Sequence, residues 1–151
     1  MPGDSYHRAA DFGQDRQTCW DVLIDIDKVA GWVEILHSVT EIKHLETYTA
    51  VIESKVGPVR LKAPLDVEVT VEEPGARAKI HATGTDPQVK SSITIDVAME
   101  LTDQTGGGTH MVLDATYSVL GKAASMGGGI IKKKADKIVE EFFGNAAKEL
   151  A

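Results

Sequence analysis

The sequence predicts an α+β fold in which a curved antiparallel sheet of six to seven strands wraps around a long C-terminal helix. Two observations lead to this prediction. Apolar and polar residues alternate along several successive stretches between about residues 39 and 120, with short turns between them. From about residue 128 apolar residues recur every three or four positions, as in an amphipathic helix. Because this helix is the only long amphipathic element, we expect it to cover the apolar face of the sheet.

The N-terminal part of the chain predicts one strand and two short helices before the main sheet begins. Residues 1–12 alternate weakly between apolar and polar types, which favours an edge strand. Residues 15–25 have helical spacing, with Asp15 placed to cap the helix N-terminus. A second short helix is expected over residues 27–32, with Asp27 as its cap.

The strands of the main sheet are predicted from period-two alternation bounded by turn residues. The longest stretch covers residues 59–72, where only Pro64 interrupts the series of charged and hydroxyl-bearing residues. Shorter stretches of the same kind are followed or preceded by glycine or proline turns. They cover residues 39–43, 47–56, 76–85, 91–102 and 109–120.

The apolar face of this predicted sheet carries many small side chains, which favours a cavity between sheet and helix. Aromatic residues make up only 5% of the chain, so few large rings are present to fill the space. Small-ligand pockets usually measure about 300–1,000 Å³. The alternative is a solid core in which the small side chains pack directly against the helix. The small inward residues are Ser54, Ala63, Ala78, Ala82 and Ala115.

Composition excludes several classes of function. The net charge of −7 disfavours binding to the phosphate backbone of a nucleic acid. Cys19 is the only cysteine, and the five histidines are scattered without the spacing of a metal site, so we expect no metal and no cofactor. Residues 1–10 lack the apolar stretch of a signal peptide, and no window reaches the length of a membrane span. We therefore expect a cytoplasmic protein, with a peripheral place at the inner face of the membrane as an alternative.

Three motifs carry a resemblance to a known family. They are the run Trp20-Asp21-Val22-Leu23-Ile24-Asp25, the strand end Lys55-Val56-Gly57-Pro58-Val59, and Gly121-Lys122-Ala123-Ala124-Ser125-Met126-Gly127, which leads into a helix with Phe142-Phe143. In this order, over nearly the whole chain, the sequence resembles the G subunit of carbon monoxide dehydrogenase (CoxG), a family of the START-like (SRPBCC) superfamily.

The resemblance implies a helix-grip fold with a deep hydrophobic cavity, formed by residues 1–151 as one START-like domain. It also implies an accessory role beside molybdenum-containing hydroxylases, in maturation or in coupling to the membrane, and no catalytic role. One departure from the family lies after the second short helix. Where the family has Cys-Ile-Pro-Gly, this chain has Trp32-Val33-Glu34-Ile35, so the loop at the cavity mouth differs.

Strand phase and helix spacing predict which side chains face the ligand. Tyr117 is the notable polar member, because a buried phenol needs a hydrogen-bond partner and could orient a ligand oxygen. A bond to a backbone carbonyl or to Ser54 is the alternative. No grouping of residues on the inward faces is typical of acid and base catalysis, so no catalytic residue is predicted. The predicted ligand-binding residues are Trp20, Trp32, Ile35, Ser54, Ala63, Leu65, Ala82, Ile95, Met111, Leu113, Ala115, Tyr117, Ile131 and Ile138.

The sequence thus favours a non-catalytic binding or carrier protein for an apolar small molecule, such as a lipid or a quinone. An enzyme of the polyketide cyclase or aromatase kind is the alternative, since one fold can support both. An assembly factor with an empty cavity is a third hypothesis. Lys132, Lys133 and Lys134 form a basic run in an acidic chain. Such a run is usually a solvated face, but it could also dock an acidic partner or anionic lipids.

Overall fold

The computed structural model describes residues 3–56 and 58–151, except for the side chains of residues 3, 59 and 126–128. Strand β1 and two short helices come first, then six strands in succession, then the long helix. The elements are β1 (Gly3–Phe12), α1 (Arg16–Leu23), α2 (Ile26–Ala30), β2 (Leu36–Lys43), β3 (Thr47–Val56), β4 (Val59–Glu73), β5 (Arg77–Asp86), β6 (Ser91–Asp103), β7 (Thr109–Gly121) and α3 (Lys122–Glu149).

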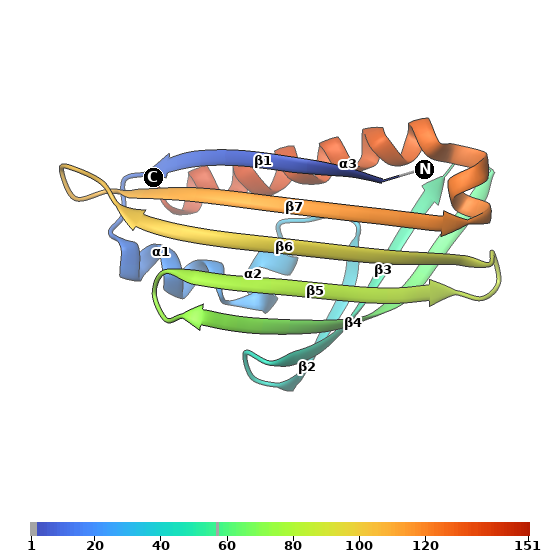
Figure 1. Cartoon of the computed structure of the whole chain (residues 1–151), viewed down its shortest axis with the longest axis horizontal. Coiled ribbons are helices and arrows are strands. Elements are labelled where there is room, and N and C mark those ends of the chain that lie inside the picture. Colours follow the sequence, from blue (N-terminus) through green and yellow to red (C-terminus); the bar gives the residue numbers. More distant parts are fainter. Residues whose placement is uncertain (1–2, 57) are drawn as a thin grey trace.

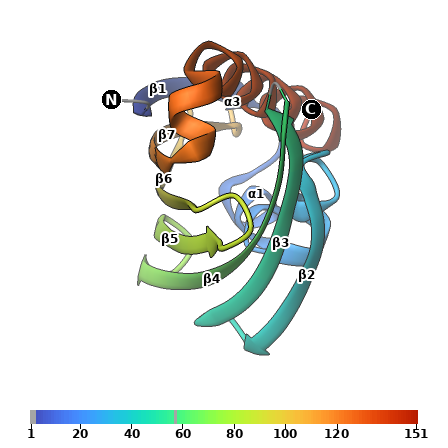
Figure 2. The same ribbon diagram turned by 90° about the vertical axis from the view of Figure 1, so that its right-hand side faces the viewer.

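The strands form one antiparallel sheet in the order β1-β7-β6-β5-β4-β3-β2 (Figure 1). Strands β2 to β7 follow one another as a meander. Strand β1 pairs with β7 and forms one edge of the sheet, where Tyr6 lies opposite Ala115 of β7. Helix α3 lies across the concave side of the curled sheet (Figure 2). The predicted fold class is confirmed: a curved sheet holds a long C-terminal helix, and two short helices follow the first strand.

Two predicted helix boundaries were wrong. Helix α2 is capped by Asp25, whose Oδ1 accepts the Lys28 N–H at 3.3 Å, and Asp27 lies in the first turn instead. Helix α3 begins six residues before the expected start, so its 28 residues extend about 42 Å. The early start is stabilised by tertiary contacts at Ala123. This residue is fully buried, and its N–H donates to Ser91 Oγ at 2.9 Å.

Strands β4 and β5 approach each other closely at Gly84. A Cβ atom at Gly84 would lie 2.1 Å from the Pro64 carbonyl oxygen, so only glycine permits this approach. Pro64 stands in β4 one residue before Leu65, which pairs with Gly84. Figure 2 shows that the strands curve beneath α3. The site is built on the concave face of this curved sheet.

Buried side chains form two clusters at the two ends of this concave face. The first cluster lies beneath the N-terminal half of α3 and includes Ala50, Ile52, Val56, Leu61, Ala63, Leu65, Ala82, Ile93, Val119, Ala123 and Ile131. The second joins β7 and α1 to the C-terminal end of α3 and comprises Phe12, Cys19, Trp20, Leu23, Ala78, Leu101, Met111, Ala146 and Leu150.

Helix α3 is anchored at both of its ends. Ala123 is buried in the first cluster, and Ala146 and Leu150 are fully buried in the second. The Leu150 carbonyl accepts the Gln14 N–H at 3.2 Å, which ties the C-terminal end of α3 to the segment after β1. Burying an apolar side chain as large as that of Leu150 contributes about 1.5–3 kcal/mol, so the C-terminal end is the stronger of the two attachments.

Between its ends, α3 is aligned with β1 by a row of polar contacts. Every second residue of β1 meets every fourth residue of α3, because two strand residues advance about 6.6 Å and four helix residues about 6.0 Å. Exposed ion pairs contribute about 0–1 kcal/mol each, so the row sets position more than stability. The contacts are Asp4 to Lys132 at 2.8 Å, Tyr6 to Asp136 at 2.6 Å and Arg8 to Glu140 at 3.3 Å.

Substitution of Met111 tests whether the second cluster is a solid core. Its side chain is fully buried there. We expect Met111→Ala to lower the free energy of unfolding by about 2–5 kcal/mol, the usual cost of such a truncation in a packed core. Chemical denaturation of both proteins measures this loss. Ile42→Ala is the control, since Ile42 is 64% exposed and should change the midpoint little. A Met111→Ala protein as stable as the parent would contradict the assignment.

Candidate functional site

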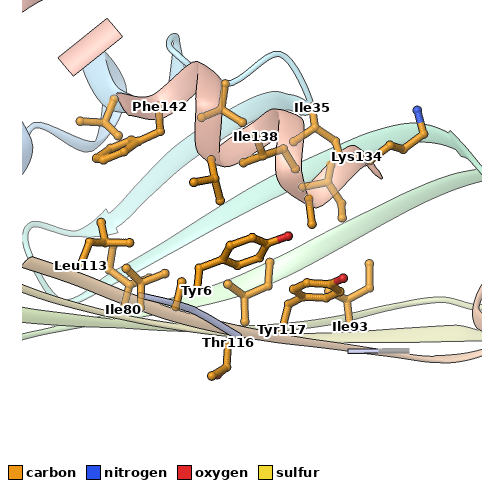
Figure 3. Close-up of a pocket in the computed structure, with 18 of the residues that line it drawn as sticks. Tyr6, Ile35, Ile80, Ile93, Leu113, Thr116, Tyr117, Lys134, Ile138 and Phe142 are labelled. Carbon is orange, nitrogen blue, oxygen red and sulfur yellow. The ribbon is translucent and has the colours of Figure 1, made fainter. Parts of the chain in front are cut away.

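A cavity of about 350 Å³ lies between the concave face of the sheet and the middle of α3 (Figure 3). Its floor comes from the strands, its roof from α3, and one end from the α1–α2 segment. The lining is almost entirely aliphatic and aromatic. The lining residues that sequence reasoning identified are Ile35, Ser54, Ile95, Leu113, Ala115, Tyr117, Ile131 and Ile138.

The other predicted site residues lie outside the lining of this cavity. Ala63, Leu65 and Ala82 pack in the first buried cluster, and Trp20 and Met111 pack in the second. Trp32 packs against Phe142, with ring centroids 5.8 Å apart. Strand phase gives the direction of these side chains, but it could not tell whether an inward side chain meets another side chain or open space.

Several lining residues were missed by the sequence prediction. Ile80 and Val97 share the inward phase of residues that were chosen on the same strands, so the alternation pattern contained the necessary signal. Tyr6 belongs to the weakly alternating first strand, opposite Ala115. Phe142 and Phe143 occur in the family motif, but which face of α3 they occupy depends on how the helix is set on the sheet.

The tyrosines Tyr6 and Tyr117 lie side by side on the floor of the cavity, with ring centroids 6.4 Å apart and an interplanar angle of 22°. The Tyr6 hydroxyl donates to Asp136 Oδ1 at 2.6 Å and accepts from Lys132 Nζ at 3.1 Å. The Lys132 ammonium also lies 4.6 Å from the centre of the Tyr6 ring. The hydrogen-bonding capacity of Tyr6 is thus taken up by α3.

Tyr117 differs, since its hydroxyl has no hydrogen-bond partner among the described residues. Neither Ser54 nor a backbone carbonyl accepts from it, so the internal bond considered as an alternative is absent from the described structure. Burial raises the pKa of Tyr117 above its ordinary value, with a smaller contribution from the Asp4 carboxylate. The phenol therefore stays neutral at physiological pH and faces the cavity as a free donor.

The three consecutive lysines of α3 point in three directions, because successive helix residues are about 100° apart. Lys132 turns to β1, where the Asp136 and Asp4 carboxylates raise the pKa of its ammonium. Lys133 is exposed. Lys134 is half-buried at the cavity, and its nitrogen points away from the tyrosine rings (Figure 3). The run is therefore not one continuous basic face.

The loop that departs from the family pattern is fastened to α3. The backbone N–H of Glu34 donates to Glu141 Oε2 at 2.9 Å, and Lys137 Nζ lies 3.2 Å from Glu34 Oε2. Asn145 Nδ2 donates to the Trp32 carbonyl at 3.1 Å. Two other residues of the loop, Val33 and Ile35, line the cavity. The loop thus closes one side of the cavity through apolar contacts inside and polar contacts outside.

No histidine, cysteine, aspartate or glutamate lines the cavity within the described part of the chain. His81 lies on the outer face of the sheet, in a second hollow of about 430 Å³, with its Nδ1 2.5 Å from Asp96 Oδ1. That contact raises the pKa of His81. His37 is exposed and lies 3.6 Å from Glu53. The described residues contain no cluster of three or more potential metal ligands.

Comparison with known proteins gives one family and many structural relatives. Residues 10–151 match the family model of CoxG, the G subunit of carbon monoxide dehydrogenase. A conserved protein from Geobacillus kaustophilus aligns with a TM-score of 0.78 at 20% identity, over 98% of this chain and 93% of that one. A START superfamily protein from Mycobacterium smegmatis aligns with a TM-score of 0.67 at 9% identity, over 97% and 99% of the two chains. The Zhui aromatase/cyclase from Streptomyces sp. R1128 aligns with a TM-score of 0.65 at 11% identity, over 98% and 91%.

At these identities the structural matches show the fold alone. No protein of curated function matches the chain significantly. Within the described residues, no helix combines the length and apolar character required to cross a bilayer.

Two alanines test whether the cavity is open space. Ala115 lines it, whereas Ala82 is 4% exposed in the first buried cluster. We expect Ala115→Leu to change stability little and to weaken binding of a fluorescent apolar probe, because the new side chain occupies the cavity. The matched change Ala82→Leu should overpack the core and cost about 1–3 kcal/mol. Equal destabilisation by both changes, with no probe binding to the parent, would show that the space is filled.

Proposed function

Since the chain belongs to the CoxG family, we propose that it is a non-catalytic carrier of an apolar molecule, such as a lipid or a quinone. The proposal treats residues 1–151 as one functional unit acting in the cytoplasm. The observation that carries it is the cavity beneath α3, whose lining is nearly all aliphatic and aromatic. An apolar lining of this kind loses contact with water only when a ligand fills the cavity or when the walls of the cavity collapse.

The size and the polar groups of the cavity support a ligand with a long apolar part and a small polar part. The volume lies near the lower limit of small-ligand pockets, which leaves room for one molecule. The Tyr117 hydroxyl, Ser54 and Lys134 are polar groups that a ligand oxygen could contact. The Tyr117 donor loses its hydrogen bonds to water when an apolar ligand fills the cavity. A ligand that carries an acceptor oxygen removes this penalty.

An enzyme of the aromatase or cyclase kind is the second candidate, favoured by the structural match to the Zhui aromatase/cyclase. Such chemistry needs a group that transfers protons near the substrate. Tyr117 is the one inward phenol with an unused hydroxyl among the described lining residues, and its pKa is raised, which opposes deprotonation. The proposed carrier role needs only the neutral phenol.

The family also supports a role beside a molybdenum-containing carbon monoxide dehydrogenase. We propose that the chain exchanges its ligand with such an enzyme. An assembly factor with an empty cavity is the third candidate, and it predicts that the purified protein contains no ligand. Native mass spectrometry of the protein from its own host distinguishes a carrier from an empty assembly factor, because a carrier retains a bound molecule of defined mass.

Tyr117→Phe tests how the ligand is held. We expect the affinity for a quinone to fall by about 0.5–1.5 kcal/mol, the worth of one hydrogen bond between neutral groups. Fluorescence titration measures this change. The control is Tyr48→Phe, since Tyr48 is buried outside the cavity and its hydroxyl accepts the Leu45 N–H at 2.8 Å. This control should lose stability and keep its affinity.

The same variants separate a carrier from an enzyme. Parent protein incubated with a quinone or a polyketide should return the molecule with unchanged mass. Chemical conversion of the quinone or polyketide by the parent protein, lost in Tyr117→Phe, would contradict the carrier proposal.

A further inference from the structure

Positive charge is concentrated in three segments of this acidic chain. Residues 54–62, 85–92 and 118–134 carry eight lysines and arginines against one acidic residue, Asp86, a net charge of +7. The whole chain has a net charge of −7, so the remaining residues carry −14. The carboxylate of Asp86 is buried and accepts the backbone N–H groups of Lys62 at 2.8 Å and Gln88 at 3.0 Å.

The fold brings these three segments to one end of the molecule. Lys55 and Arg60 are cross-strand neighbours in the β3–β4 hairpin, and the Lys62–Asp86 contact joins this hairpin to the β5–β6 turn. The N–H of Lys122 donates to the Lys90 carbonyl at 3.3 Å, which joins that turn to the start of α3. Figure 1 shows the strand ends and the first turns of α3 gathered there.

Six of the exposed cations at this end are not paired with an acidic side chain of the protein itself. Within the described ranges, Lys132 pairs with Asp4 and Asp136, whereas the other exposed cations of the three segments form no ion pair, although most cations elsewhere in the chain do. We call these residues the basic end: Lys55, Arg60, Lys62, Lys90, Lys122 and Lys133.

Two exposed apolar side chains lie within the same end. Leu120 is 51% exposed, two residues before Lys122, and Ile130 is 38% exposed, three residues before Lys133. The cavity reaches the same region, because Val56 and Ile131 line it. Cations, exposed apolar side chains and the cavity therefore occur together at one end of an otherwise acidic molecule.

From this arrangement we infer that the basic end docks the protein on an anionic lipid bilayer, so that ligand is exchanged there between cavity and membrane. Each basic side chain near an anionic surface contributes on the order of 1 kcal/mol, and several acting together give reversible binding. The strongly negative remainder is repelled by the same surface, which orients the molecule. The choice of a bilayer over an acidic protein depends on the proposed function, because an apolar ligand partitions into lipid.

The docking test measures co-sedimentation with vesicles of phosphatidylcholine alone or mixed with phosphatidylglycerol. We expect binding only to the anionic vesicles, and loss of binding at high salt. The triple change Lys55→Gln, Arg60→Gln, Lys122→Gln should lower the partition coefficient by about tenfold or more. The matched control Lys43→Gln, Lys79→Gln, Lys148→Gln removes the same charge elsewhere and should have a much smaller effect. Equal effects of the two triple changes would overturn the inference.

Insertion of the apolar residues distinguishes a bilayer from an acidic protein. Cys19 is fully buried, so an environment-sensitive thiol dye will label Leu120→Cys selectively, and Ile42→Cys, beside the β2–β3 turn, is the control. We expect a blue shift at position 120 with anionic vesicles and none at position 42. Binding to polyglutamate as strong as to vesicles, without a shift at position 120, would indicate an acidic protein partner and overturn the lipid docking.

Binding of the apolar probe in solution, without vesicles, tests the proposed carrier function separately from the docking inference. The basic-end variant should bind the apolar probe as the parent does, since none of its three changed residues lines the cavity. Loss of vesicle binding with intact probe binding supports the inference. Vesicle binding by a parent that binds no apolar probe would refute ligand exchange at the membrane and, with it, the proposed carrier function.

Discussion

The attachment of α3 at both ends over a sheet too curved for it to fill is the constraint on which the rest of the structure depends. Ala123 at one end, and Ala146 and Leu150 at the other, are fully buried. The sheet curves away between them (Figure 2). A helix held at both ends in this way cannot pack down onto the sheet without detaching one of its buried ends. The space beneath its middle remains, and its walls are apolar.

Polar contacts then decide where the helix lies along the sheet. Their row along β1 uses the near match between two strand residues and four helix residues, and a second group fastens the loop after α2. Each contact is worth little alone because water competes for both partners. Tyr6 connects this row to the cavity, since its ring lies in the wall while its hydroxyl is bound by Asp136. Tyr117 beside it remains free for a ligand.

Positive charge is concentrated at the end of the molecule that the cavity reaches. A chain with net charge −7 would be expected to avoid an anionic surface, yet one end of it is strongly positive. Screening in physiological salt limits electrostatic effects to about 8 Å, so the sign of the nearest end governs an approach more than the net charge does. The proposed carrier function and the inferred docking surface thus involve the same end of the molecule, where the cavity, the exposed Leu120 and the basic end occur together.

The sequence by itself determined the order of the elements, the inward face of each strand and the family. These depend on periodicity and local motifs, such as the alternation over residues 59–72. Only the tertiary structure decided which inward residues meet open space. Ala115 and Ala82 have the same phase in the sequence, but one lines the cavity and the other is packed. Lys132 and Lys134 are close together in the sequence and point to different places. Periodicity fixes the direction of a side chain, whereas its surroundings depend on elements far away in the chain, which no local pattern encodes.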